Sequence, residues 1–128
     1  MNSKNNWLIA VIIILLLATS IVLASDGINI YQVNWGNPHL RGTSTWITAY
    51  INNGESRPIS GVAILQLSVP DWYTRTFQQN FSLSGSENQP SVQINFTIDQ
   101  NWPTGNYKAR VYIPTLDDDG LDGTILVK

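Results

Sequence analysis

Apolar and polar residues alternate strictly along the segment 91–99, where Val92, Ile94, Phe96 and Ile98 are each followed by a polar residue. Successive side chains of a β-strand point to opposite faces, so this pattern predicts a strand with one buried face and one solvated face. No stretch after residue 26 shows the helical period, and Gly, Pro and Asn recur at short intervals. The pattern therefore favours an all-β body.

Further segments repeat this two-residue period, and each predicts a strand with an apolar inner face. Turn residues separate these segments, and Asn53-Gly54 and Thr104-Gly105 are expected to supply turn positions with positive φ. The count is about seven short strands, which predicts one immunoglobulin-like, two-sheet antiparallel β-sandwich over residues 26–128. The segments are 62–69, 77–83 and 106–113, with outer strands at 28–35 and 124–127.

The segment 45–51 is ambiguous because neither of its faces is polar. Trp46 and Tyr50 alternate with Ile47 and Ile51. Either both faces are covered, or one of them is an exposed apolar patch.

An uncharged run of about 18 residues, at positions 7–24, precedes the body. As a helix rising 1.5 Å per residue it would reach about 27 Å, close to the hydrocarbon thickness of a bilayer. Lys4 lies before the run and Asp26 after it, which predicts a short cytoplasmic N-terminus at residues 1–6 and a body outside the cell. Two interpretations remain open: a permanent transmembrane anchor, or a secretory signal cleaved after Ala24.

Composition excludes several function classes. The formal net charge is −2, so phosphate backbones would not be attracted and nucleic acid is not expected as a partner. The chain has no cysteine and one histidine, His39, which is expected to be an ordinary loop residue. Without a Gly-x-Ser-x-Gly turn or a set of metal-binding His and Cys residues, the sequence predicts that the protein is not an enzyme.

One acidic segment, Thr115 to Gly123, is a candidate metal site. Asp117, Asp119 and Asp122 offer the hard oxygen ligands that calcium prefers, although their spacing does not match the EF-hand loop. The alternative is a solvated acidic turn between the last two strands. No other cofactor is expected.

Several aromatic residues are candidates for contact with a partner or a sugar, against the alternative that they pack in the core or at sandwich corners. Aromatic side chains are enriched in protein interfaces, which favours a protein partner over a sugar. The candidates for interaction are Trp46, Tyr50, Trp72 and Tyr73, whereas Trp102 is expected at a corner.

Two tripeptides, Asn80-Phe81-Ser82 and Asn95-Phe96-Thr97, are N-glycosylation sequons. Asn80 and Asn95 alternate with inward Phe residues, so both are expected to face solvent. Their modification requires that the chain be exported and that the organism have N-glycosylation.

Three stretches carry a family resemblance. YINNG (50–54), GVAILQLSVPDWY (61–73) and WPTGNYKARVYI (102–113) resemble, in this order, the second-strand turn, the third strand with its Pro-x-x-Trp corner, and the start of a late strand. They are similar to the adhesion-like domains of archaeal and bacterial surface proteins, the CARDB and NEW3 types, which are related to fibronectin III. This sequence departs from them at Asp71, where Gly is more common, and in having a single copy. The resemblance implies an extracellular, non-catalytic structural or interaction module.

These observations together predict a cell-envelope protein that contacts another surface protein. Two alternatives stay open: a carbohydrate-binding module, and a subunit that polymerises with itself after its leader is cleaved. In the second alternative the freed strand 28–35 would complete a neighbour's sheet.

Overall fold

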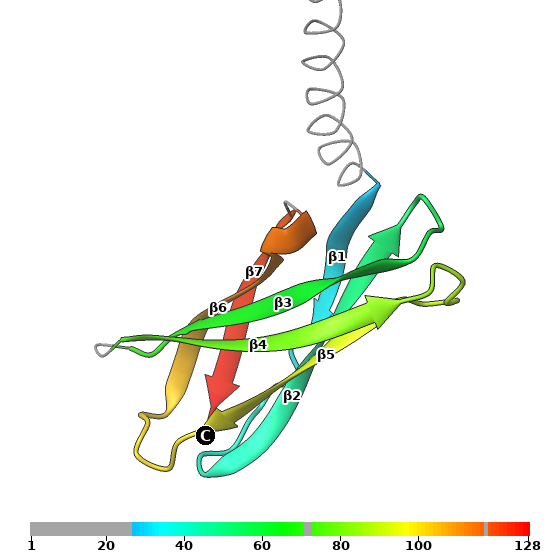
Figure 1. Cartoon of the computed structure of the whole chain (residues 1–128). Helices are drawn as coiled ribbons and strands as arrows, with labels where there is room; N and C mark the ends of the chain where they lie inside the picture. Colours follow the sequence, from blue (N-terminus) through cyan, green and yellow to red (C-terminus); the bar gives the residue numbers. More distant parts are fainter. Residues whose placement is uncertain (1–26, 71–72, 117) are drawn as a thin grey trace, which may run out of the picture.

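The computed structural model describes residues 27–70, 73–116 and 118–128 (Figure 1). Within these ranges the chain forms two antiparallel sheets, one of three strands in the order β1-β2-β5 and one of four in the order β4-β3-β6-β7. The strands are β1 (Ile28–Asn34), β2 (Thr43–Asn53), β3 (Ile59–Ser68), β4 (Thr74–Leu83), β5 (Ser91–Ile98), β6 (Gly105–Ile113) and β7 (Asp118–Val127), with a short 3₁₀ helix at Pro114–Leu116. The expected all-β class, with seven strands in two antiparallel sheets, is confirmed.

The expected N-terminal helix at residues 7–24 lies outside the described residues. Within the described ranges, no helix has both the length and the apolar character needed to cross a membrane.

Alternating side chains from both sheets fill the space between the layers. On β5, for example, Val92, Ile94, Phe96 and Ile98 are buried, and the residues between them are exposed. The predicted strand at 91–99 is therefore confirmed in position and in the face it buries. β3 and β6 contribute the same alternation from the other sheet.

The ambiguous segment 45–51 forms the middle of β2, the central strand of the three-stranded sheet. Ile47 and Ile51 point into the core and are 1% exposed each, whereas Trp46 on the opposite face is 54% exposed. One face of β2 thus packs in the core, and the other presents an aromatic surface to solvent.

A corner between β5 and β6 is closed by two aromatic residues. The Tyr107 hydroxyl donates a hydrogen bond to the carbonyl of Pro103, four residues upstream. Burial raises the pKa of this hydroxyl, so it remains a protonated donor at neutral pH. Trp102, 2% exposed, packs against the Tyr107 ring with 5.9 Å between the ring centroids.

The segment after β1 is bonded along β7. Backbone groups of His39 bond to Leu126 and Lys128, and the Asn37 side chain bonds to backbone groups of Thr124 and Leu126. The N–H of Arg41 adds a bond to the carbonyl of Lys128. Parallel pairing of 37–41 with 124–128 therefore joins the two sheets along one side of the sandwich.

The His39 side chain is buried in this joint, at 4% exposed. Its Nε2 lies 2.5 Å from the carbonyl oxygen of Trp35, which only accepts, so Nε2 carries the proton. Its Nδ1 shares a hydrogen bond with the Thr45 hydroxyl at 3.0 Å. His39 is a loop residue as expected, and both of its ring nitrogens bind the protein itself.

Two local expectations were wrong. β7 begins at Asp118, so Asp118, Asp119 and Asp122 belong to a strand and not to a turn between the last two strands. Near residue 54, the positive φ falls on Ser56, at 49°, and not on Gly54.

Candidate interaction surface

The three-stranded sheet contains no charged residue. None of the residues of β1, β2 and β5 is Asp, Glu, Lys or Arg. The four-stranded sheet, in contrast, contains six charged residues: Arg75, Lys108, Arg110, Asp118, Asp119 and Asp122. The strands thus divide into a neutral layer and a charged layer.

Aromatic and uncharged polar side chains form the outer face of the neutral layer, which we call the neutral face. It comprises Tyr31, Gln32 and Asn34 of β1, Ser44, Trp46, Thr48, Tyr50 and Asn52 of β2, and Ser91, Gln93, Asn95 and Thr97 of β5. Several of the polar side chains bond to one another, as Ser44 does to Thr97 at 3.3 Å and Gln93 to Asn95 at 3.1 Å.

Three aromatic residues stand on the neutral face. Trp46 and Tyr31 are 54% and 47% exposed, and Tyr50 is half-buried between Gln32 and Ser91, its partners in register. The Tyr31 and Tyr50 ring centroids are 6.4 Å apart and their planes are inclined by 44°. Two of the residues predicted for interaction, Trp46 and Tyr50, therefore lie on one face.

Sequence reasoning missed Tyr31 as a surface residue. The signal was the two-residue period of β1: Ile28 and Ile30 are buried, so Tyr31, which follows Ile30, belongs to the outer face. A β-bulge between Ile30 and Gln32 then shifts the register against β2 beside this residue.

The other two predicted interaction residues lie elsewhere. Tyr73 is 41% exposed at the corner before β4, where its hydroxyl accepts from the indole nitrogen of Trp102 at 3.2 Å. The Arg75 guanidinium lies 4.9 Å from the centre of the Tyr73 ring. These contacts give Tyr73 a role in bracing the corner. Trp72 lies outside the described residues.

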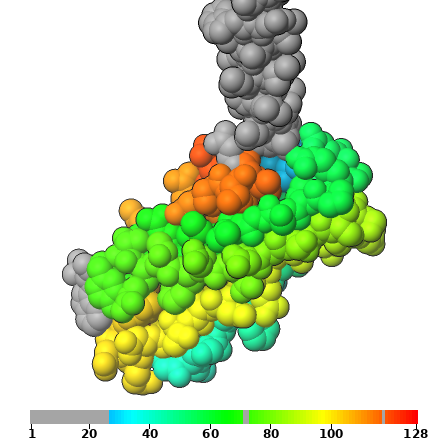
Figure 2. Space-filling view, viewed as in Figure 1, coloured from blue at the N-terminus to red at the C-terminus, as the bar shows by residue number. Residues whose placement is uncertain are grey.

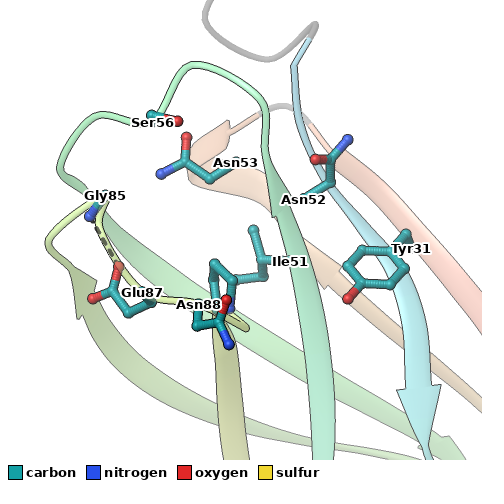
Figure 3. A pocket seen from close by; sticks show the side chains of 9 residues that line it. Tyr31, Ile51, Asn52, Asn53, Ser56, Gly85, Glu87 and Asn88 are labelled. Carbon is teal, nitrogen blue, oxygen red and sulfur yellow. Dashed lines mark hydrogen bonds between the residues drawn. The ribbon is translucent and has the colours of Figure 1, made fainter.

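A shallow pocket of about 480 Å³ opens at the end of the sandwich where β1 begins (Figure 3). Tyr31 and Asn52 reach it from the strands, and Glu87 and Asn88 reach it from the loop after β4. Asn53 also lines the pocket, and its buried Oδ1 has no hydrogen-bond partner among the described residues. Because it shares Tyr31 and Asn52, the pocket continues the neutral face at one end.

Glu87 is the charged residue of this pocket, and the loop around it binds its carboxylate. The backbone N–H groups of Ser84 and Gly85 donate to it at 2.7 Å and 2.9 Å, and the Ser84 hydroxyl adds a third bond. These donors, led by the Ser84 N–H, lower the pKa of Glu87 from 4.5 to about 2. The carboxylate is therefore already satisfied by its own loop.

The acidic segment of β7 makes structural contacts. The Asp118 carboxylate accepts from the N–H of Ile30, at 2.9 Å, and from the N–H of Gly120, at 3.1 Å. Gly120 has a φ of 79°, and a Cβ there would overlap the carbonyl of Val111, so the strand requires glycine at this position. Asp118, which was not among the predicted ligands, thus joins β7 to β1.

The predicted calcium ligands are only partly described. Asp119 accepts from Arg110 through its backbone carbonyl, and the exposed carboxylate of Asp122 lies 3.6 Å from the Arg110 guanidinium. Asp117 lies outside the described residues. Within the described part of the chain no group of three or more acidic, His or Cys residues is placed to hold a metal ion.

The two sequon asparagines, Asn80 on β4 and Asn95 on β5, are both exposed. Asn95 is the register partner of Trp46 on the neutral face.

Comparison with solved structures supports the fold. One part of a Paenibacillus cycloisomaltooligosaccharide glucanotransferase, complexed with cycloisomaltoheptaose, matches 78% of this chain with a TM-score of 0.60 and 20% identity. A part of a Pseudomonas fluorescens alkylpurine DNA glycosylase bound to DNA matches 84% with a TM-score of 0.55 and 13% identity. This chain spans only 14% and 32% of those proteins, so the similarity covers a single portion of each.

No protein-family model matches the sequence, and no curated protein matches it.

Proposed function

We propose that this chain is a non-catalytic, immunoglobulin-like interaction module, held outside the cell membrane by residues 7–24, whose neutral face binds another protein of the cell envelope. The main observation behind this proposal is that the three-stranded sheet has no charged residue and exposes Trp46 and Tyr31. Protein interfaces are enriched in Tyr and Trp, and their cores are depleted in charged residues. The neutral face has this composition.

Two features support the immunoglobulin-like assignment. The hydrogen bond from Tyr107, near the start of the sixth strand, to the carbonyl of Pro103 has the geometry of a tyrosine corner. Strands one, two and five share a sheet, and three, six and seven share the other, as in a constant-type immunoglobulin domain. The fourth strand differs, because here it pairs with the third. Both features agree with the CARDB-type resemblance of residues 50–113.

The membrane assignment is supported by sequence. The uncharged run at 7–24 ends only a few residues before β1, so a retained helix would keep the sandwich next to the bilayer. A partner would then lie at the membrane surface or within the same complex.

Substitution on the neutral face tests the proposal. Trp46→Ala and Tyr50→Ala in the full-length chain should weaken co-purification of one defined membrane partner by about 30-fold or more, the effect of losing an interface hot spot. Leu40→Ala is the matched control, because Leu40 is 57% exposed and lies outside the strands. Equal capture by all three variants would overturn the assignment of this face.

A carbohydrate-binding module is the second candidate. Exposed aromatic rings among amides and hydroxyls, on strands without a charged residue, also suit a neutral sugar, and the similar glucanotransferase is complexed with a cyclic oligosaccharide. The inclination of the Tyr31 and Tyr50 rings means that this pair does not form a flat stacking platform. Retardation of the wild-type chain, but not of Trp46→Ala, in gels containing neutral polysaccharides would favour this candidate over the first.

A self-polymerising subunit is the third candidate, and its donor strand would be 28–35. In the folded chain this segment is β1, paired with β2 and burying Ile28 and Ile30. Intact mass of the mature protein tests the idea, because retention of residues 1–24 would argue against polymerisation by strand donation.

We also propose calcium binding at Asp117, Asp119 and Asp122, and glycosylation at Asn80 and Asn95. A calcium-dependent rise in the unfolding temperature that Asp119→Asn abolishes would support calcium binding.

A glycan on Asn95 would lie beside Trp46, its register partner, so we expect this modification to compete with binding at the neutral face.

A further inference from the structure

Among the described residues, the strands of the two sheets are hydrogen-bonded to each other along one long side of the sandwich but not along the other. On one side β1 and β7 are joined by the bond from Ile30 to Asp118 and by the pairing of 37–41 with 124–128. On the other side β4 and β5 are the outermost strands of their sheets. They contact each other through Phe77 and Phe96, whose ring centroids are 5.7 Å apart.

The outer edge of β4 is left open. In the described ranges, no other strand donates a hydrogen bond to it beyond its ladder partner β3, and an exposed bond from the Gln79 side chain to the Asn80 carbonyl lies within the strand itself. Figure 2 shows β4 as an uncovered yellow-green strip along the face presented. Its unpaired backbone groups are therefore available to another strand.

The strand also lacks the features that usually protect an edge. β4 is ten residues long and pairs with β3 without a bulge, and after Arg75 it contains no charge and no proline. Natural edge strands are blunted by charges, prolines, bulges or short length. β1 and β7 each have a bulge, and β7 has three aspartates in addition.

The side chains of β4 are symmetric about Gln79. Thr76 and Ser82 are hydroxyl residues, Phe77 and Phe81 are identical, and Gln78 and Asn80 are amides. In an antiparallel pair of two copies centred on Gln79, each residue would face its counterpart: Phe77 opposite Phe81, Gln78 opposite Asn80, and Thr76 opposite Ser82. Aromatic and hydroxyl pairs of this kind stabilise antiparallel strands, and a two-fold interface requires such self-complementarity.

β5 has a similar pattern about Ile94, but its inner side chains are already buried: Val92 is 4% exposed and Phe96 is 3% exposed. Phe77 and Phe81 of β4 are only half-buried. A neighbouring strand would thus cover more apolar surface at β4 than at β5, which selects β4 as the pairing edge.

We propose that β4 is a homodimerisation edge, at which two copies of this chain pair antiparallel about Gln79 and join their four-stranded sheets into one of eight strands. This surface is separate from the neutral face, so the dimer would carry two copies of that face. The self-complementary register favours a second copy over an unrelated strand.

Cysteine cross-linking of the full-length chain tests the register, since the chain has no cysteine of its own. Directly opposed residues of an antiparallel pair have Cα atoms about 4.5 or 5.5 Å apart, which suits a disulfide. Under mild oxidation Gln79→Cys should give about tenfold more disulfide dimer than Gln93→Cys on β5. A mixture of Gln78→Cys and Asn80→Cys chains should cross-link more than either chain alone.

One control substitution and one charge-repulsion variant complete the test. Asn80→Gln, in every variant that keeps Asn80, removes the sequon and leaves an amide opposite Gln78, so that no glycan obstructs the edge. Gln78→Lys with Asn80→Lys, both on the exposed face, should shift the sedimenting species from dimer to monomer while tryptophan fluorescence stays native. A monomeric parent chain, or cross-linking through Gln93→Cys equal to that through Gln79→Cys, would overturn the proposal.

Discussion

Tyr107 shows how one hydroxyl contributes to the stability of this sandwich. Its ring is fully buried, and its O–H satisfies the carbonyl of Pro103 at the corner between the sheets. A small domain without disulfides has to draw its stability from packing and from bonds of this kind.

Replacing Tyr107 by Phe keeps the ring and removes the donor. We expect Tyr107→Phe to lower the free energy of unfolding by about 1–3 kcal/mol, because the carbonyl of Pro103 loses its partner in a partly buried site. Urea unfolding followed by tryptophan fluorescence measures this change. Tyr31→Phe is the control, since Tyr31 is exposed on the neutral face, and equal losses for both variants would contradict the structural role of the corner.

For single residues, the sequence indicated which side chains could contact a partner, but it did not show which of them are exposed. Trp46 was identified as a candidate for contact, but alternation alone did not decide whether it was buried, since Ile47 beside it is also apolar. The decision comes from long-range packing, because the opposite sheet covers Ile47 and nothing in the described chain covers Trp46. Tyr73 had the same sequence signal and is instead bonded to Trp102.

At the scale of elements, the loop after β4 is organised around one carboxylate. Donors from Ser84 and Gly85 surround Glu87 and lower its pKa to about 2. Because the pKa is lower in the folded protein than in the unfolded chain, the stabilising contribution is complete above about pH 4.5 and is lost as the pH falls towards 2.

The conformation of this loop should therefore depend on pH. We expect the amide resonances of Ser84 and Gly85 to titrate with a midpoint near the Glu87 pKa of about 2, measured by NMR on the chain in detergent. In Glu87→Gln the same resonances should be displaced already at neutral pH and show no such titration. A midpoint near the ordinary value of 4.5 would show that the loop does not hold the carboxylate.

Strands with a clean two-residue period, such as β5 and β6, were predictable from sequence because one polar face fixes the direction of every side chain. The start of β7 was not, since Asp and Gly are depleted in strands and normally indicate a turn. Here the bond from Asp118 to Ile30 and the left-handed Gly120 hold that segment in the sheet. The symmetry of β4 was readable in the sequence, but it acquires meaning only when the topology places the strand at an edge.

At the scale of the whole sandwich, the ion pairs of the described residues contribute little to stability. The described ranges contain two, Arg57 with Glu55 and Arg110 with Asp122, and all four side chains are substantially exposed. Exposed pairs of this kind are worth about 0–1 kcal/mol each and are screened by salt.

Stability should accordingly be nearly independent of ionic strength. Between about 0.05 and 1 M NaCl we expect the free energy of unfolding to change by less than about 1 kcal/mol. Urea titrations at several salt concentrations measure this dependence. A steep fall with salt would instead show that charge pairs dominate the fold.

The parallel pairing of 37–41 with 124–128 has a mechanical consequence. β1 begins at one end of the sandwich and the chain finishes at the other (Figure 1). Tension between the start of β1 and the C-terminus would slide these two segments lengthwise, so that their five hydrogen bonds bear the load together and do not open one after another. A domain built in this way withstands being pulled from its two ends better than being peeled open from the side.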